Sequence, residues 1–203
     1  MRKTYIRRIV PLVFGLLFCC ACGSAALPEA TQPMEAKPGT LSITFEYVKQ
    51  RGYASNQFAV WIEVQDGTPV KTLYATPYTA TGGYKNRPDS IPTWVARGFS
   101  GADIDTVASA TPKAGRLTYL WDLTDDAGNP MPAGVYRFCV EGTLRWKNQV
   151  MYTGEIAVGG DAAKAEALPE FTFAEAPNQP ALTNDAPECG MIGPVAAEYR
   201  AAE

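Results

Sequence analysis

Regular alternation of apolar and polar residues is the feature that most restricts how this chain can fold. In residues 41–47 the large apolar side chains take the odd-numbered positions, and Ser, Thr and Glu take the even-numbered ones. In residues 58–64 Phe, Val and Ile again take every second position. A period of two residues is that of a strand buried on one face. The alternation therefore predicts β-strands, each with one face in a core.

Similar runs along the chain extend this pattern to about seven strands. Asp66-Gly67 is a hairpin signal after the second run. The further predicted strands are 70–76, 117–123, 134–142, 149–158 and 191–199. Most of these runs end in Gly, Pro, Asn or Asp, and no long stretch has a helical period. The pattern predicts an all-β, antiparallel two-sheet sandwich over residues 40–200.

Two long segments interrupt the predicted strands. Residues 77–115 are expected to form one long insertion, because connections within a sandwich are usually far shorter. Residues 159–190 are rich in Pro, Ala and Glu and are expected to form an exposed loop. Within that loop, Phe171-Thr172-Phe173 could add one short edge strand.

The connection between two of the predicted strands carries a recognisable turn. It comprises residues 121–130 and 132–136, in which Asp and Asn can bond nearby backbone N–H groups and Gly128 can take a positive φ. A calcium site is the alternative, because three acids lie close together: Asp122, Asp125 and Asp126. They lack the alternate spacing of a calcium loop, so the turn is favoured and no metal site is predicted. The segment resembles the strand–turn–strand of immunoglobulin-like modules, notably that of the flagellar hook-capping protein, and implies an immunoglobulin-like sandwich.

The first 21 residues have the layout of a secretory signal. Four basic residues precede 13 uncharged residues, 9–21, whereas a membrane-spanning helix needs about 20. The sequence Ala21-Cys22-Gly23-Ser24 resembles the lipobox of bacterial lipoproteins. The resemblance implies that residues 1–21 are a signal peptide and that Cys22 becomes the lipidated first residue. Residues 22–39, with several prolines, are expected to form a tether.

Composition excludes several classes of function. The chain has 18 basic and 21 acidic residues, a net charge of −3, which argues against nucleic-acid binding. It has no histidine, which excludes Ser-His-Asp triads, Cys-His pairs and histidine metal ligands. No Walker loop, G-x-S-x-G or dinucleotide fingerprint is present. The sequence therefore predicts a protein that is not an enzyme.

Two cysteines remain after the signal, Cys139 and Cys189. A disulfide between them is allowed outside the cytoplasm. Cys139 lies in a predicted strand and Cys189 in the Pro-rich segment, and pairing cannot be deduced from sequence. Two isolated thiols are the favoured interpretation, and the disulfide stays open.

The insertion contains the candidate ligand-binding residues. Tyr84, Lys85, Arg87 and Trp94 combine aromatic rings with positive charge, which suits a planar anionic ligand. The favoured alternative is that the insertion covers an open end of the sandwich with Trp94 as its plug, because large aromatic residues mostly serve burial. A short helix is expected to start at Asp89 or Ser90, before Ile91-Pro92, with Pro in its first turn.

The same insertion contains Asp105-Thr106-Val107-Ala108-Ser109-Ala110-Thr111. This segment resembles the sequence at which a flavin transferase joins flavin mononucleotide (FMN) to a threonine hydroxyl. The resemblance implies Thr111 as acceptor, with Asp105 at the start of the motif. The favoured alternative is a short helical turn capped by Asp105 and ended before Pro112.

A wider set of motifs runs through residues 41–200. They are 54–63, Lys71-Thr72-Leu73-Tyr74, Gly82-Gly83-Tyr84-Lys85, Pro88-Asp89-Ser90, Thr111-Pro112, Gly142-Thr143-Leu144-Arg145-Trp146 and Ala197-Glu198-Tyr199. Together they are similar to an uncharacterised family of predicted periplasmic bacterial proteins, domain of unknown function family 2271. The resemblance implies an exported β-rich domain with no assigned reaction, some of whose members belong to systems that handle extracytoplasmic flavins.

These observations predict a non-catalytic binding or assembly module outside the cytoplasm, in the periplasm or at the cell surface. A lipid on Cys22 would hold it at the membrane. The 77–115 insertion would contact an envelope protein, and neither nucleic acid nor a cofactor is expected. The alternative is a flavin-carrying electron-transfer subunit with FMN on Thr111.

Overall fold

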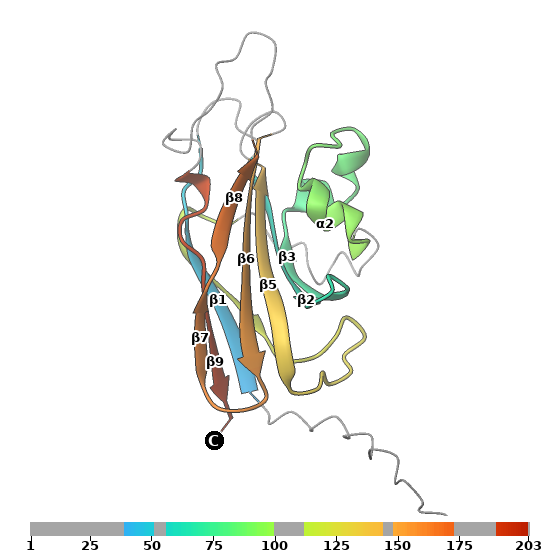
Figure 1. Cartoon of the computed structure of the whole chain (residues 1–203). Coiled ribbons are helices and arrows are strands. Elements are labelled where there is room, and N and C mark those ends of the chain that lie inside the picture. The colour runs from blue at the N-terminus through green and yellow to red at the C-terminus, as the bar shows by residue number, and fades with distance from the viewer. Residues whose placement is uncertain (1–38, 51–55, 100–111, 144–147, 173–189, 203) are drawn as a thin grey trace, which may run out of the picture. The chain divides into compact units, whose positions relative to one another are not determined.

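Nine strands in two antiparallel sheets make up most of the described chain. The computed structural model describes residues 39–50, 56–99, 112–143, 148–172 and 190–202, all of which belong to the unit 33–203. The sheets face each other across a shared core, so the predicted all-β sandwich is confirmed (Figure 1). The strands are β1 (Gly39–Tyr47), β2 (Gln57–Val64), β3 (Pro69–Ala75), β4 (Gly115–Trp121), β5 (Gly134–Thr143), β6 (Gln149–Val158), β7 (Ala163–Glu166), β8 (Leu168–Thr172) and β9 (Ala196–Ala201).

The strands divide into a four-stranded and a five-stranded sheet. Their orders are β4-β1-β9-β7 and β3-β2-β5-β6-β8. In the first sheet Ile43 of β1 lies opposite Tyr119 of β4 and Ala197 of β9. In the second, Val60 of β2 lies opposite Val140 of β5. This register turns the apolar residues of the alternating runs toward the space between the sheets.

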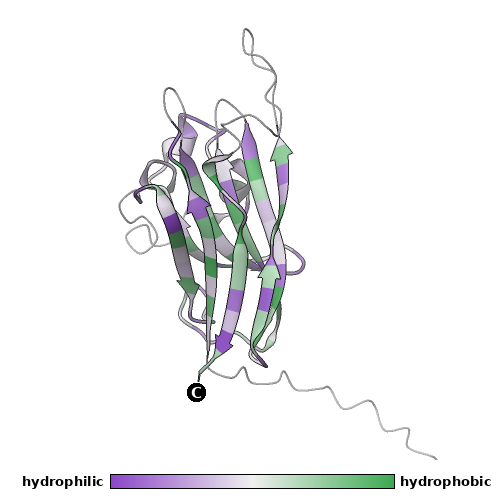
Figure 2. Ribbon diagram, turned by 90° about the vertical axis from the view of Figure 1, so that its left-hand side faces the viewer, coloured by the Kyte–Doolittle hydropathy of each residue, from purple (hydrophilic) through white to green (hydrophobic). Residues whose placement is uncertain are grey.

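Aromatic side chains fill much of the core. The ring of Phe58 lies 5.8 Å from that of Phe45, 5.1 Å from that of Tyr47 and 4.8 Å from that of Tyr74, measured between centroids. Figure 2 shows apolar and polar residues alternating along the strands. The inward half of each alternation therefore supplies the core, as the period of two predicts.

The predicted loop 159–190 contains two strands within its described part. β8 includes the expected edge strand at Phe171 and Thr172, and it pairs with β6. β7 was not expected, because its sequence Ala-Lys-Ala-Glu lacks large apolar residues. It pairs with β9, and its small alanines turn inward. Residues 173–189 lie outside the described part.

The structure differs from the prediction at the start of the last strand and at the end of the tether. The last strand was expected from Met191 but begins at Ala196, because Gly193-Pro194 interrupts it and proline cannot donate a ladder hydrogen bond. Ile192 still forms an isolated bridge with Tyr47. The tether was expected to extend to Gly39, yet this residue already pairs with Ala201 in the sheet.

Candidate functional site

The long insertion covers one outer face of the sandwich. It folds into the helix α1 (Pro77–Ala80), the 3₁₀ turn η1 (Gly83–Lys85) and the helix α2 (Pro92–Ala96). These elements lie beside β2, β3 and β5 of the five-stranded sheet (Figure 1). The insertion was expected to cover an open end of the sandwich, and it covers a sheet face instead.

A second hydrophobic core lies between the insertion and the sheet. Trp94 of α2 is 1% exposed, and its ring stacks on that of Phe99 at 6.2 Å. Trp61 of β2 packs beside them, and the Trp94 indole N–H donates to Thr72 of β3 at 3.1 Å. Trp94 therefore belongs to a core. Its predicted role as a surface for ligand stacking does not fit the structure, because no ligand can reach its face.

A buried carboxylate caps α2 from the sheet. Glu141 of β5 accepts hydrogen bonds from the backbone N–H of Thr93 at 3.0 Å and of Trp94 at 2.8 Å. These are N–H groups that a helix cannot satisfy itself. The helix does begin at the predicted proline, Pro92, but its cap is neither Asp89 nor Ser90. A residue about 50 positions away takes that role.

Ile91 enters α2 in a strained conformation. Its φ is +42°, a region that β-branched residues rarely adopt and that costs on the order of 1–3 kcal/mol. Its side chain is buried, and its N–H donates to the Thr143 hydroxyl at 2.8 Å. That hydroxyl in turn donates to the carbonyl of Asp89 at 3.2 Å. The sheet therefore holds the chain in place where α2 begins.

An ionic cluster fixes the other end of α2. Glu63 of β2 is 1% exposed and lies 3.3 Å from Arg97, directly after α2, and 3.2 Å from Arg137 of β5. The Trp61 indole N–H donates to the same carboxylate at 3.3 Å. Because a buried charge needs such compensation, this cluster ties the insertion to two strands.

The contact between Glu141 and the start of α2 is expected to make the stability of the protein depend on pH. Burial raises the pKa of Glu141, although its hydrogen bonds from Thr93 and Trp94 oppose the shift. A raised folded-state pKa contributes stability below the unfolded value, here 4.5, and that contribution is lost as pH rises through the folded pKa. We expect the free energy of unfolding of the natural protein, relative to that of Glu141→Gln, to decrease from pH 4 upward.

Urea unfolding at several pH values measures this difference. Glu155→Gln is the matched control, because Glu155 lies exposed on the neighbouring strand β6. A difference between the natural protein and Glu141→Gln that stays constant with pH would contradict the buried-carboxylate anchor.

The remaining candidate ligand-binding residues lie on the outer side of the insertion. Lys85 in η1 is exposed, and Tyr84 beside it is partly exposed. Arg87 lies 3.8 Å from Asp89, so its charge is partly balanced. Tyr78 of α1 adds a ring that is 44% exposed. Tyr84, Lys85 and Arg87 are thus at least partly exposed, whereas Trp94 is buried.

Cys139 is a free thiol beneath the insertion. Burial and the negative charge of Glu63 both raise the pKa of this thiol. Cys189 lies outside the described residues, as do the predicted modification sites Cys22, Asp105 and Thr111.

The segment that carries Asp122, Asp125 and Asp126 folds as a tight turn. Asp125 accepts hydrogen bonds from the backbone N–H of Ala127 at 2.9 Å and of Asn129 at 2.8 Å, and Gly128 has a φ of +83°. The side-chain hydrogen bond from Asn129 is the main reason that the pKa of Asp125 is lowered. Asp122 turns instead toward Lys71. Within the described ranges, no group of three acids or cysteines is placed to hold a metal.

Sequence reasoning missed Glu63 and Glu141 as structural anchors. Both alternate with core residues, so the period of two alone does not show that they are buried. Trp61 could have indicated their burial, because a tryptophan on the same face of β2 suggests that this face is covered. The length of the insertion also suggests that it covers a face of the sheet.

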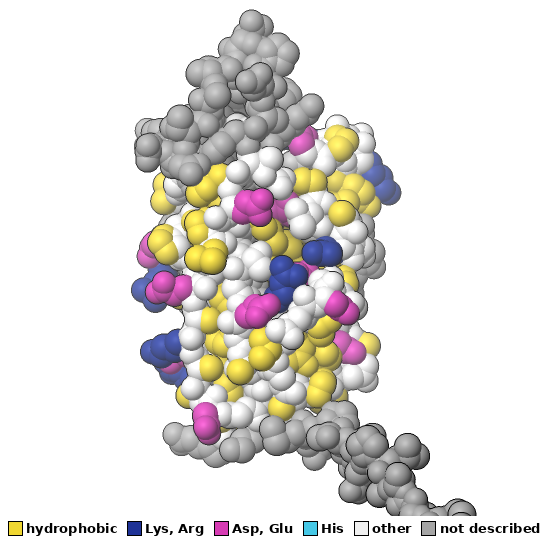
Figure 3. Space-filling model, in the orientation of Figure 1, with side chains coloured by type: hydrophobic (Ala, Val, Ile, Leu, Met, Phe, Trp, Pro, Cys, Tyr) yellow, Lys and Arg dark blue, Asp and Glu magenta, His cyan; other side chains and the backbone are white. Residues whose placement is uncertain are grey.

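Charges on this side of the molecule are mixed. Figure 3 shows basic side chains beside acidic ones near the middle of the face rather than in one large basic patch. Among the helices in the described ranges, none has the length and apolar character needed to cross a membrane.

Comparisons with known proteins identify the family of this chain. No curated protein and no solved structure matches it significantly. A family model matches residues 40–171, which include the insertion and its anchors in β2 and β5. The chain is therefore an extracytoplasmic protein that belongs to the family described as "Predicted periplasmic protein (DUF2271)".

Proposed function

We propose that this protein is a non-catalytic binding module that recognises an envelope protein through the outer side of its insertion. Tyr78, Tyr84 and Lys85 form this surface, which we call the insertion tip. A lipid on Cys22 would hold the module at the membrane, as the lipobox-like sequence implies.

The contrast between the two sides of the insertion carries this proposal. On the inner side, Glu63 and Glu141 and the Trp94 core fix α2 to the sheet. On the outer side, aromatic and basic side chains remain accessible. Tyrosine is enriched at protein interfaces because it offers a large contact area at a small entropic cost. A rigid support also lowers the cost of binding, since little further ordering is needed.

Photocrosslinking in living bacteria tests the insertion tip. We expect a photoreactive amino acid at position 78 of the full chain to give a crosslink to one discrete envelope protein, because that side chain would lie in the interface. The crosslinked products are separated by gel electrophoresis and identified by mass spectrometry.

Position 168 provides the matched control. Leu168 is 80% exposed on β8, an edge strand of the same sheet. The proposed surface would be contradicted if both positions gave the same crosslinked product at equal yield. It would also be contradicted if position 78 gave no crosslinked product.

We keep flavin attachment at Thr111 as a second proposal, with Asp105 in its motif. Lys113, Ala114 and Gly115, which follow this segment, are exposed, so a transferase can approach the chain there. An extracytoplasmic location also suits such a modification. The transferase and its metal would have to activate the hydroxyl, since threonine alone is a weak nucleophile.

Intact mass spectrometry after coexpression with a bacterial flavin transferase tests this second proposal. One FMN addition is expected, and it should disappear in Thr111→Val. An unmodified mass, with a known acceptor protein labelled in the same cells, would refute flavin attachment.

A further inference from the structure

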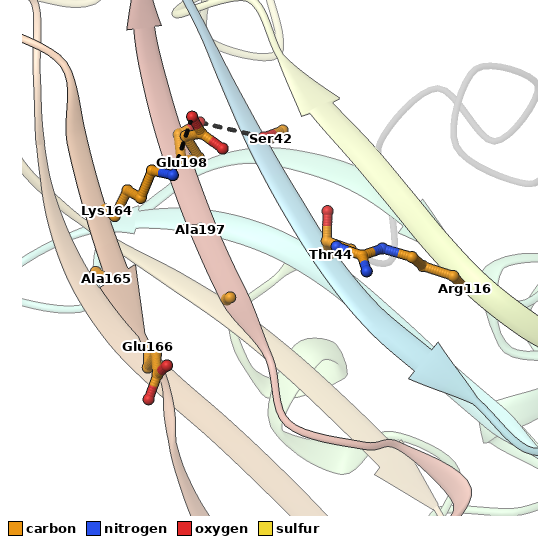
Figure 4. A pocket seen from close by; sticks show the side chains of 9 residues that line it. Ser42, Thr44, Arg116, Lys164, Ala165, Glu166, Ala197 and Glu198 are labelled. Carbon is orange, nitrogen blue, oxygen red and sulfur yellow. Dashed lines mark hydrogen bonds and ion pairs between the residues drawn. The ribbon is translucent and has the colours of Figure 1, made fainter.

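The outer face of the four-stranded sheet carries a hollow of about 590 Å³. Figure 4 shows this hollow from close by. Ala196 and Ala197 of β9 lie at its floor, and longer side chains from β4 and β7 flank it. It lies on the sheet that the insertion does not cover, so any ligand here would be separate from the insertion tip.

Strand register arranges the lining side chains in two neighbouring rows. In one row Lys164 of β7 lies opposite Glu198 of β9, and their charged atoms are 3.6 Å apart. In the next row Glu166 lies opposite Ala196, which in turn lies opposite Thr44 of β1. Because alanine ends at Cβ, this second row is open at its centre.

Opposite charges flank the open row. Arg116 extends from β4 toward Thr44, and Glu166 lies on β7 (Figure 4). Among the residues that the structure describes, neither Arg116 nor Glu166 makes an ion pair or a side-chain hydrogen bond. Glu198 differs, since Lys164 already compensates its charge. The hollow therefore offers one cation and one anion to a ligand.

The span between these charges sets the size of that ligand. β4 and β7 are separated by β1 and β9, so their backbones lie about 14 Å apart at the usual strand spacing. The long Arg116 side chain covers part of this distance. Two extended residues of peptide span about 7 Å, which suits the remainder.

We propose that the hollow binds short peptides in their zwitterionic form. The Arg116 guanidinium donates hydrogen bonds to the terminal carboxylate, a pairing that its planar fork favours. The terminal ammonium pairs with Glu166, and the peptide lies over Ala196 and Thr44. A hollow of about 140 Å³, lined by Glu46 as well as by Thr44, Arg116 and Ala196, gives room for a side chain. Glu46 lies opposite Arg116 in the strand register, so an uncharged or basic side chain suits this hollow better than an acidic one.

Isothermal titration calorimetry of the full-length protein tests this site. The probe is alanyl-alanine, compared with N-acetyl-alanyl-alanine and with alanyl-alanine amide. Each modified peptide lacks one terminal charge. We expect each to bind at least about tenfold more weakly than the zwitterion, because each loses a charge-assisted contact.

Four variants assign the two contacts. In Arg116→Gln the contact to the terminal carboxylate is lost, so alanyl-alanine and its amide should bind equally. In Glu166→Gln the contact to the terminal ammonium is lost, so alanyl-alanine and its acetylated form should bind equally. Ala196→Phe should abolish binding by filling the hollow, whereas Glu170→Gln, on the other sheet, should change nothing. Equal binding of the three peptides, no binding of the dipeptide, or unchanged binding in Arg116→Gln and Glu166→Gln would overturn the proposal.

Discussion

Replacing Trp94 with alanine is expected to lower the free energy of unfolding by about 3–5 kcal/mol. The side chain is almost fully buried, it stacks on Phe99, and its indole N–H bonds Thr72. The substitution removes these contacts and leaves a cavity between α2 and the sheet. Urea unfolding followed by far-UV circular dichroism measures the change.

Leu120→Ala is the control for this measurement. Leu120 is also a large apolar residue, but it is 63% exposed on β4, so its loss should change the free energy by about 0.5 kcal/mol or less. A loss below about 1 kcal/mol in Trp94→Ala would mean that the insertion does not form a packed core with the sheet.

Removing both arginines around Glu63 is expected to cost about 3–5 kcal/mol. In Arg97→Met with Arg137→Met, the methionines keep most of the apolar stems while the charges disappear. The buried Glu63 carboxylate then lacks compensation, apart from the Trp61 indole N–H. The destabilisation therefore arises from an unpaired buried charge rather than from lost packing.

Adding Glu63→Gln to the double variant tests that cause. The triple variant no longer has a buried charge at position 63, so most of the lost stability should return. Urea unfolding of the natural protein, the double variant and the triple variant at neutral pH gives the comparison. If the triple variant is no more stable than the double variant, packing rather than charge explains the loss.

Strand positions could be predicted because they depend on a local pattern. The alternation in residues 41–47 and 58–64 survives in β1 and β2 with the expected faces inward. β7 could not be predicted in this way. Its four residues have no large apolar side chain, and it is a strand because β9 offers it a pairing edge.

The support of the insertion depends on contacts that are distant in sequence. Glu141 caps a helix about 50 residues earlier, and Glu63 pairs with residues from two other elements. A local pattern shows these carboxylates on the outer side of strands but not what covers them. The basic and aromatic residues of the insertion were predicted as a group, and burial then divided Trp94 from the rest.

The hollow also depends on register rather than on a motif. Arg116 and Glu166 belong to strands at opposite edges of one sheet. Only the pairing of β1 with β9 and of β9 with β7 places Thr44, Ala196 and Glu166 in one row. A single sequence does not specify such a pairing.

Crosslinking in cells with the charge of the insertion tip reversed tests the central claim most directly. The full chain carries the photoreactive residue at position 78 together with Lys85→Glu, and Lys164→Glu on the other sheet is the control. If the tip is the recognition surface, Lys85→Glu should reduce the crosslink yield by about tenfold or more, and Lys164→Glu should leave it unchanged. Equal yields from the two variants would contradict recognition through the insertion.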